Sequence, residues 1–459
     1  MKYAKQDAPH VWALAFGFVA LAAMNVGCGG HTARTLAMRT ALDAGDPHGA
    51  IAALDDELDV KSPKEMPKDI QGDNALLVLD RASIQQSIAQ FQDSSRDFES
   101  ADKAIDMLDL AHNAGDTIGQ YVFSDSAGKY QAPPYEKLLI NTLNMINYLE
   151  RQDLNGAKIE ARRLNVMQKY VADQLNEPKN SVLGLGGFLA GFAFEKSGDS
   201  DQALRYYDQA LQFPGFDSLR GPVRAMLALS SYRTPRLSEI EQDPMPPSED
   251  STNEGELVVV VGYGRVPHKI SNRIPVGLAL TLFASDINPN DASAANKLAA
   301  QGLVTWVNFP TMGDEQGEYA SPNCSVDNRS IDLGSTTNVT HEVKMEWHKM
   351  EGKIVASAIT RMIARALVGQ GIQTATGRGD NAVGVIGLIA SLGTQATLTA
   401  LDTPDTRSWE TLPARVGVAR IRVPAGRHTI RLDARGVSRT QVIDIPKGGW
   451  KVVSLMALR

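Results

Sequence analysis

The residues with the most definite chemistry stand near the start of the chain, where a cysteine closes an apolar run. Two lysines make the first residues basic, and Val11 to Val26 is almost wholly apolar. Gly27 and Cys28 follow directly. This order is typical of an export signal that is cut before a cysteine, whose thiol then carries a lipid. We therefore predict a lipoprotein signal peptide at residues 1–27 and lipid attachment at Cys28.

Other interpretations of this segment stay open. The apolar stretch has about 16 residues, whereas a membrane-spanning helix needs about 20, so a transmembrane anchor is the weaker interpretation. Cleavage near Ala20, Ala22 or Ala23 would instead give a soluble periplasmic or secreted protein. Asn25 stands where bacterial lipoproteins usually carry an apolar residue. An aspartate directly after the lipidated cysteine retains lipoproteins in the inner membrane. This chain has Gly29 at that position, which favours a periplasm-facing protein of the outer membrane.

Residues suited to catalysis or metal binding form no recognisable pattern elsewhere. If Cys28 is acylated, Cys324 has no disulfide partner, and we expect an ordinary buried thiol. His341 and His348 do not have the four-residue spacing of a zinc-binding helix. The sequence contains no phosphate-binding loop, G-x-S-x-G motif or C-x-x-C pair. We therefore predict no catalytic residue, no cofactor, no metal site and no enzyme activity. An envelope-remodelling enzyme with scattered catalytic residues is a third hypothesis.

Charge is segregated along the chain. The net charge is −7, yet residues 407–459 hold eleven Lys or Arg and three acidic residues. Arg420, Arg422, Arg427 and Arg431 fall on predicted strands or turns and are candidates for a basic face. Such a face would attract lipid headgroups, lipopolysaccharide or cell-wall polymer, would dock on acidic protein surface, or would be an ordinary solvated strand face. Nucleic acid is not an expected partner of an exported protein with this overall charge.

Residues 28–235 are predicted to be all-α, because apolar residues recur there at helical spacing. The predicted helices are Leu36–Leu58, Asn74–Phe91, Ala101–Ala111, Tyr135–Leu149, Gly156–Leu175, Phe188–Glu195 and Gln202–Phe213. An Asp-x-x-x-Ala motif recurs at the expected turns, at Asp46, Asp153 and Asp199, with a weaker copy at Asp97. The last copy resembles a tetratricopeptide repeat, in which stacked helical hairpins form a surface that binds other chains. A plain helical bundle is the alternative.

Residues 236–256 are predicted to be an acidic linker, because they contain prolines and no Lys or Arg after Arg236. Residues 257–459 are predicted to form an α+β domain. Its first strands are placed at Leu257–Val261, Val276–Phe283 and Leu303–Phe309, and its helices at Ala292–Gln301, Glu351–Gly369 and residues 383–401. Residues 414–459 alternate apolar and polar residues between turns, which predicts a small antiparallel β-sandwich packed on helices.

Three segments carry a family resemblance. They are residues 134–163, which begin PYEKLL, residues 255–267, which begin GELVV, and residues 402–429, which begin DTPDTRSWETLPA. Together they resemble an uncharacterised family of proteobacterial lipoproteins with tetratricopeptide-like helical repeats and a C-terminal α+β domain. The resemblance implies a periplasm-facing lipoprotein that occurs together with other small lipoproteins. It implies no particular activity.

Within the third segment, four residues are candidates for an interaction site or a structural corner. Trp409 and Pro413 are predicted to anchor the junction between the helix at 383–401 and the β-sandwich, since a buried Trp occupies a large area and needs a partner for its N–H. Asp405 and Arg407 would brace that corner. Contact with a ligand is the alternative role.

These observations predict a lipid-anchored periplasmic scaffold or assembly factor that binds protein partners at the cell envelope. The helical repeats would hold one partner, and other small lipoproteins are candidates for it. The alternative is a module that binds envelope glycan or lipid through the basic β face near the C-terminus.

Overall fold

The computed structural model describes residues 30–70, 72–110, 130, 132–174, 180–243, 253–300, 306–317, 321–376 and 403–459. Three predictions lie outside these residues: the signal peptide with Cys28, the central part of the linker, and the helix at 383–401. Within the described residues, none of the helices combines the length and the apolar character that crossing a bilayer requires.

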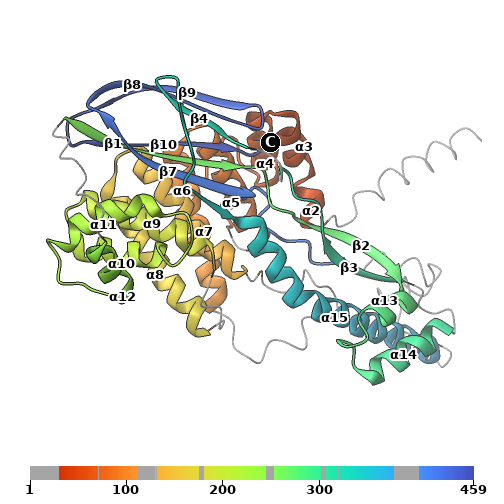
Figure 1. Cartoon of the computed structure of the whole chain (residues 1–459). Helices are drawn as coiled ribbons and strands as arrows, with labels where there is room; N and C mark the ends of the chain where they lie inside the picture. The colour runs from red at the N-terminus through yellow and green to blue at the C-terminus, as the bar shows by residue number, and fades with distance from the viewer. Residues whose placement is uncertain are drawn as a thin grey trace, which may run out of the picture.

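The described regular structure is helical up to residue 242 and mixed α and β after it, which confirms the α+β class (Figure 1). The helices of the first part are α2 (His31–Arg34), α3 (Leu36–Ala44), α4 (Pro47–Glu57), α5 (Asp73–Ser87), α6 (Phe91–Leu110), α7 (Pro134–Glu150), α8 (Leu154–Gln174), α9 (Val182–Lys196), α10 (Ser200–Ala210), the 3-10 turn η3 (Asp217–Leu219), α11 (Arg220–Leu227) and α12 (Pro235–Gln242).

Successive helices pack as hairpins that share one turn geometry: α3 with α4, α5 with α6, α7 with α8, and α9 with α10. In each turn one residue has a positive φ, and the N–H of the next residue donates to the carbonyl five residues earlier. This pattern closes the last turn of a helix. The positive-φ residues are Gly45, Ala89, Gln152 and Gly198.

The recurring aspartates begin the second helix of three of these hairpins. Asp46, Asp153 and Asp199 each accept a hydrogen bond from the backbone N–H three residues later, at 2.9, 2.9 and 3.1 Å. A side-chain oxygen at this position satisfies an N–H that has no partner within the helix. The sequence motif therefore marked these turns correctly.

The fourth copy of the motif does not mark a turn. Asp97 lies inside α6, is buried, and its carboxylate lies 2.6 Å from Nε of Arg81. The turn of this hairpin is formed by Ala89 and Gln90 instead. The motif missed it because Gln replaces the aspartate there, and Ser94 takes the place of the small alanine.

The second part contains β1 (Glu254–Tyr263), β2 (Lys269–Pro275), α13 (Val276–Leu282), α14 (Pro289–Ala300), β3 (Trp306–Met312), β4 (Asn323–Val326), β5 (Arg329–Ile331), β6 (Ser335–Asn338), α15 (Val339–Thr376), β7 (Arg415–Pro424), β8 (Gly426–Ala434), β9 (Val437–Ile445) and β10 (Trp450–Ala457). The strands form a central sheet in the order β10-β1-β7-β6, an outer sheet in the order β5-β4-β8-β9, and the ribbon β2-β3. In the central sheet β1 runs parallel to β10 and antiparallel to β7.

The central sheet lies between the helices and the outer sheet, so it is buried on both faces. Val258 and Val260 of β1 belong to the core shared with the helices. Leu257, Val259 and Val261 belong to the core between the two sheets. The expected sandwich packed on helices is therefore present, but residues 414–459 do not form it alone, because β1, β4, β5 and β6 complete its sheets.

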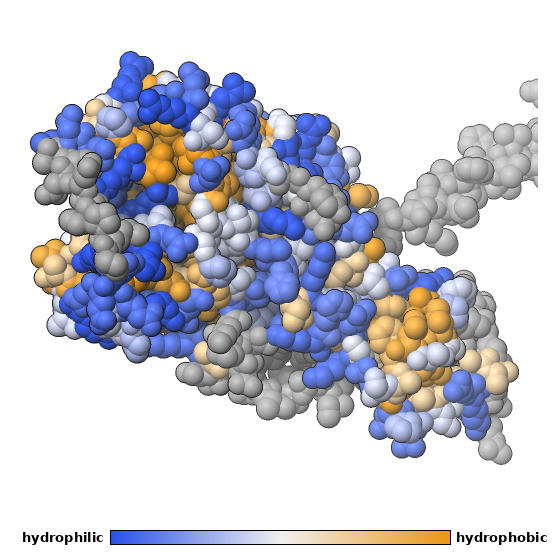
Figure 2. Space-filling model, in the orientation of Figure 1, coloured by the Kyte–Doolittle hydropathy of each residue, from blue (hydrophilic) through white to orange (hydrophobic). Residues whose placement is uncertain are grey.

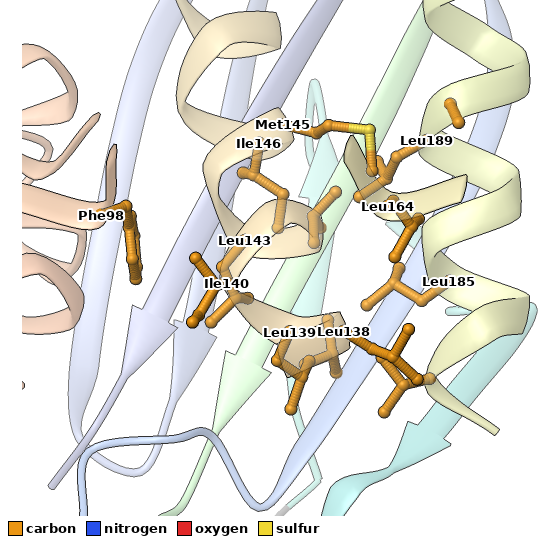
Figure 3. Close-up of a cluster of buried hydrophobic side chains, with 14 of the residues drawn as sticks. Phe98, Leu138, Leu139, Ile140, Leu143, Met145, Ile146, Leu164, Leu185 and Leu189 are labelled. Atoms are coloured by element: carbon orange, nitrogen blue, oxygen red, sulfur yellow. The ribbon is translucent and has the colours of Figure 1, made fainter. Parts of the chain in front are cut away.

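Helix α7 occupies the middle of the larger core. Figure 3 shows its side chains reaching Phe98 of α6 on one side and residues of α8 and α9 on the other. The same core includes side chains of β1, β7 and β10. The predicted boundary between a helical domain and an α+β domain therefore does not separate two hydrophobic cores.

Two predicted elements differ from the structure. Val276–Leu282 is a helix instead of a strand, and its Val276 and Ala279 are buried three residues apart, as a helical face requires. A short apolar run does not distinguish the two structures. The first part of the predicted linker is also helical: α12 begins with Pro235 after the capping residue Thr234 and buries Leu237.

The ribbon β2-β3, helices α13 and α14, and part of α15 have a small core of their own, and we call these elements the appendage. Figure 1 shows the appendage extending from the end of the body where α2 lies. Its core contains Val276, Val307, Phe309, Val355 and Ile359.

Candidate functional site

Residues 403–414 form an extended segment that crosses the interior, and we call it the strap. All of its residues are buried except Thr403 and Asp405, which are half-buried. The strap connects the region of α2 to β7 and lies against α5 and α7. A buried segment without regular structure needs partners for its backbone N–H groups, because an unpaired buried N–H is costly.

Carboxyl groups of two helices supply those partners. Asp80 of α5 accepts hydrogen bonds from the backbone N–H of Glu410 at 3.1 Å and of Thr411 at 3.0 Å. Glu136 of α7 accepts one from the backbone N–H of Trp409 at 3.0 Å. Burial and the charge of Glu410 raise the pKa of Asp80 well above its usual range, and burial raises the pKa of Glu136. These groups fix the path of the strap.

Trp409 is the largest side chain that the strap buries, with 1% of its surface exposed. Its indole N–H donates to Oγ of Ser83 at 3.1 Å, and the ring meets Phe98 edge-on with centroids 5.8 Å apart. The structure therefore places Trp409 against α5 and α6. Its predicted neighbour, the helix at 383–401, lies outside the described residues.

Asp405 and Arg407, which were predicted to brace the corner, pair directly with each other. Nε and Nη2 of Arg407 donate to the two oxygens of Asp405 at 2.8 and 2.7 Å. Burial opposes the charge of Asp405, but its hydrogen bonds with Arg407 lower its pKa. Pro413 lies at the other end of the strap, beside Gly262 of β1. The candidate corner is thus two separate contacts along one strap.

The residues that hold the strap, Asp80 and Glu136, were not predicted. A signal for them exists, because Asp80 directly follows the apolar run ALLVL of α5 and Glu136 precedes the apolar run of α7. A buried carboxyl group next to such a run is either paired or functional.

The candidate basic face does not form as predicted, because Arg420 points toward the helices. Nη2 of Arg420 lies 2.6 Å from a carboxylate oxygen of Glu195 and 2.8 Å from one of Glu256, and its Nη1 donates to the hydroxyl of Tyr207 at 2.9 Å. Burial alone would raise the pKa of Glu195, but Arg420 and Lys196 lower it to about 2. The cluster fastens α9 and α10 to the central sheet.

The other three arginines are exposed and lie in different surroundings. Arg422 borders a shallow pocket near Lys196 and Glu256. Arg427 and Arg431 lie on the outer sheet, where Arg431 pairs with Asp433 at 2.8 Å and Arg427 stands opposite an aspartate of β9. The outer sheet therefore presents mixed charge.

A cavity of about 270 Å³ lies beside the strap, between α7, α15 and the start of β2. It is lined by Tyr130, Ala132, Pro133, Pro134, Tyr135, Glu136, Lys269, Met312, Val343, Glu346, Trp347, Met350 and Ser408. The hydroxyl of Tyr130 donates to Glu136 at 2.5 Å. Both oxygens of this buried carboxylate thus accept hydrogen bonds from protein groups.

The remaining candidates for chemistry are separated from one another. Cys324 is buried on β4, and burial raises the pKa of its thiol to about 11, so it is not an activated nucleophile. His428 pairs with Asp327, with Nδ1 2.7 Å from a carboxylate oxygen. Among the described residues, no group of three or more His, Cys, Asp and Glu side chains is arranged to hold a metal ion.

Comparison with protein-family models, with curated proteins and with solved structures gives no significant match. The lipoprotein resemblance therefore stays a prediction from the sequence. Any functional conclusion has to rest on the residues and surfaces of this chain.

Proposed function

We propose that the protein is a lipid-anchored scaffold or assembly factor of the bacterial envelope, attached to the outer membrane through Cys28 and facing the periplasm. The export pattern before Cys28 supports the anchor. The helical hairpins with their repeated turn geometry support degenerate tetratricopeptide-like repeats. Such repeats hold protein partners.

The partner surface is the outer side of the hairpins. The first helices of three hairpins, α5, α7 and α9, are buried along most of their length. Val416, Val418 and Val452 of the central sheet belong to the same core. The inner face of the hairpins, which a partner would otherwise use, is thus covered by the protein's own central sheet. The second helices of the hairpins remain available for binding.

An exposed stripe along α8 carries the proposal. Ile159 and Val166 are 49% and 67% exposed, and Tyr170 is 37% exposed. Steps of seven and four residues place these apolar side chains on one helical face. A helix of this kind normally turns its apolar residues inward, so an apolar outer face favours an interaction surface.

Basic side chains accompany this stripe. Arg162 and Lys169 are exposed and lie at steps of three from Ile159 and Val166, which puts them on the same face. The stripe therefore combines apolar and positive groups, and it fits a partner helix with apolar and acidic residues on one side.

Photo-crosslinking in intact cells tests this assignment. Benzoylphenylalanine at Ile159, Val166 or Tyr170 should capture the same envelope protein from each position. The matched control is Val442, an apolar residue of the outer sheet that is also exposed. Reversing charge with Arg162→Glu and Lys169→Glu should lower the yield at least tenfold. A yield no higher than at Val442 would contradict the scaffold proposal, and a yield unchanged by the charge reversal would contradict an acidic partner.

A further inference from the structure

The tip of the appendage exposes large apolar side chains to the surroundings. Leu278 and Leu282 of α13 are 46% and 62% exposed, and their spacing of four places them on one helical face. Trp306 is 41% exposed and stands opposite Pro275, the residue before α13. Figure 2 shows hydrophobic residues gathered on the appendage, apart from those of the body.

The composition of this tip matches that of a lipid–water interface. The guanidinium of Arg273 lies over the ring of Trp306, 5.1 Å from its centroid. Trp is enriched at the level of lipid headgroups, and an Arg beside it keeps its charge in water while its stem covers apolar surface. Leucines at an exposed helical face would enter the lipid below that level.

The distance from the proposed anchor to the body is short. Gly30 packs against the strap, and the backbone N–H of Thr32 donates to Oγ1 of Thr406 at 3.2 Å. Oγ1 of Thr32 donates to the carbonyl of Lys269, the first residue of β2, at 3.0 Å. Two residues of extended chain span at most about 7 Å. The backbone of a lipidated Cys28 would therefore lie within about 7 Å of Gly30, and its lipid would enter the bilayer near the start of the ribbon.

We infer that the tip of the appendage, with Leu278, Leu282 and Trp306, lies on the lipid bilayer to which Cys28 is anchored. The inference rests on the proposed lipid anchor. The ribbon rises about 3.4 Å per residue, so Pro275 lies about 20 Å from Lys269. Figure 1 shows α2 and the appendage at the same end of the body, and α8 at the other. Anchor and tip then give the body two contacts with the membrane and leave the stripe of α8 free for a partner.

Quenching of a single fluorophore by labelled lipid tests whether the tip of the appendage lies on the bilayer. The lipidated full-length Leu282→Cys protein is labelled with an environment-sensitive dye and placed in vesicles of phosphatidylethanolamine and phosphatidylglycerol. Cys324 is 1% exposed and should not take the dye. Val442→Cys on the outer sheet is the control. Spin-labelled lipid should quench the dye at position 282 at least threefold more than the dye at position 442. A second label at Trp306→Cys should respond like the first.

The possible outcomes separate this inference from the proposed function. Equal quenching at positions 282 and 442 in acylated protein would overturn the contact of the tip with the bilayer. It would leave the proposed scaffold function unaffected. A blue shift at position 282 without quenching would show that protein, either a partner or another part of this chain, covers the tip, and would also overturn that contact. Metabolic labelling with a palmitate analogue reports the anchor separately. If wild-type protein does not incorporate the palmitate analogue, both the lipid anchor and the contact of the tip with the bilayer are contradicted.

Discussion

Two buried carboxyl groups hold the backbone of the strap, and a third, Glu410 of the strap itself, pairs with an arginine. Asp80 and Glu136 accept the N–H groups of the strap, and Glu410 lies 2.5 Å from Nη1 of Arg39 in α3. An extended segment inside a core has no ladder of its own to satisfy its backbone groups. Its position therefore depends on a few acceptors, and two of them, Asp80 and Glu136, come from helices in the first part of the chain.

His31 gives a prediction at the scale of one residue. Burial and the charge of Arg34 lower its pKa to about 3, so the folded protein keeps the ring neutral, whereas the unfolded chain protonates it near pH 6.5. Because the unfolded state then binds the extra proton, stability falls as pH decreases from 6.5 toward 3. His31→Leu removes this effect. The free energy of unfolding of the variant, relative to wild type, should rise by about 2 kcal/mol between pH 7 and pH 5.

Urea unfolding at both pH values measures this difference. Substitution of the exposed His48, on α4, by Leu is the control for losing a histidine at the surface. A constant difference for His31→Leu would mean that the ring is protonated in the folded protein.

At the scale of elements, the hairpins depend on small residues where two helices meet. Gly191 of α9 lies against Tyr207 of α10, and a Cβ at Gly191 would overlap the tyrosine ring. Close contact between the helices therefore requires the absence of a side chain. The tyrosine, whose hydroxyl joins the Arg420 cluster, is held in place by this contact.

Gly191→Ala should destabilise the protein by about 1–3 kcal/mol, because overpacking forces neighbouring groups to move. Gly221 of α11 is a matched control, since a Cβ there meets no atom within 4 Å. Gly221→Ala should be neutral or stabilise by up to about 1 kcal/mol. Thermal unfolding followed by circular dichroism compares the two variants, and equal effects would mean that the contact of α9 with α10 is not tight.

At the scale of the whole molecule, the central sheet joins the two parts of the chain. Its outer face packs on the second sheet and its inner face on the helices. The cluster of Arg420 with Glu195 and Glu256 adds a polar attachment at the same boundary. The stability of the helices and that of the two sheets should therefore depend on each other.

Arg420→Ala should weaken this boundary strongly. It leaves two largely buried carboxylates with Lys196 as the cation that still pairs with both, so the cost should be up to about 3–5 kcal/mol. Arg422→Ala, on the same strand but exposed, should change stability by about 1 kcal/mol or less.

Glu195 has its pKa lowered to about 2, so its contribution to stability is present above about pH 4.5 and is lost as pH falls toward 2. The difference between wild type and Arg420→Ala should shrink over that range in denaturant unfolding. Equal costs for Arg420→Ala and Arg422→Ala would contradict a polar attachment at this boundary.

The sequence determined those features that depend on neighbours within a few residues. Helical periodicity placed the longer helices of the first part, and the caps at Asp46, Asp153 and Asp199 lie where the motif marked them, because a cap bonds to an N–H only three residues away. The pair Asp405 and Arg407 was predictable for the same reason, since the two residues are neighbours in the chain.

Which side chains are buried with which partners depends on how the helices and sheets pack together. Asp80 and the strap N–H of Glu410 are 330 residues apart in sequence. Arg420 belongs to an alternating strand, and the pattern alone does not tell whether its face meets water or the acidic helices. Val276–Leu282 is apolar enough for a strand or a helix, and packing in the appendage selected the helix. Burial is a property of the assembled layers, so local sequence does not contain it.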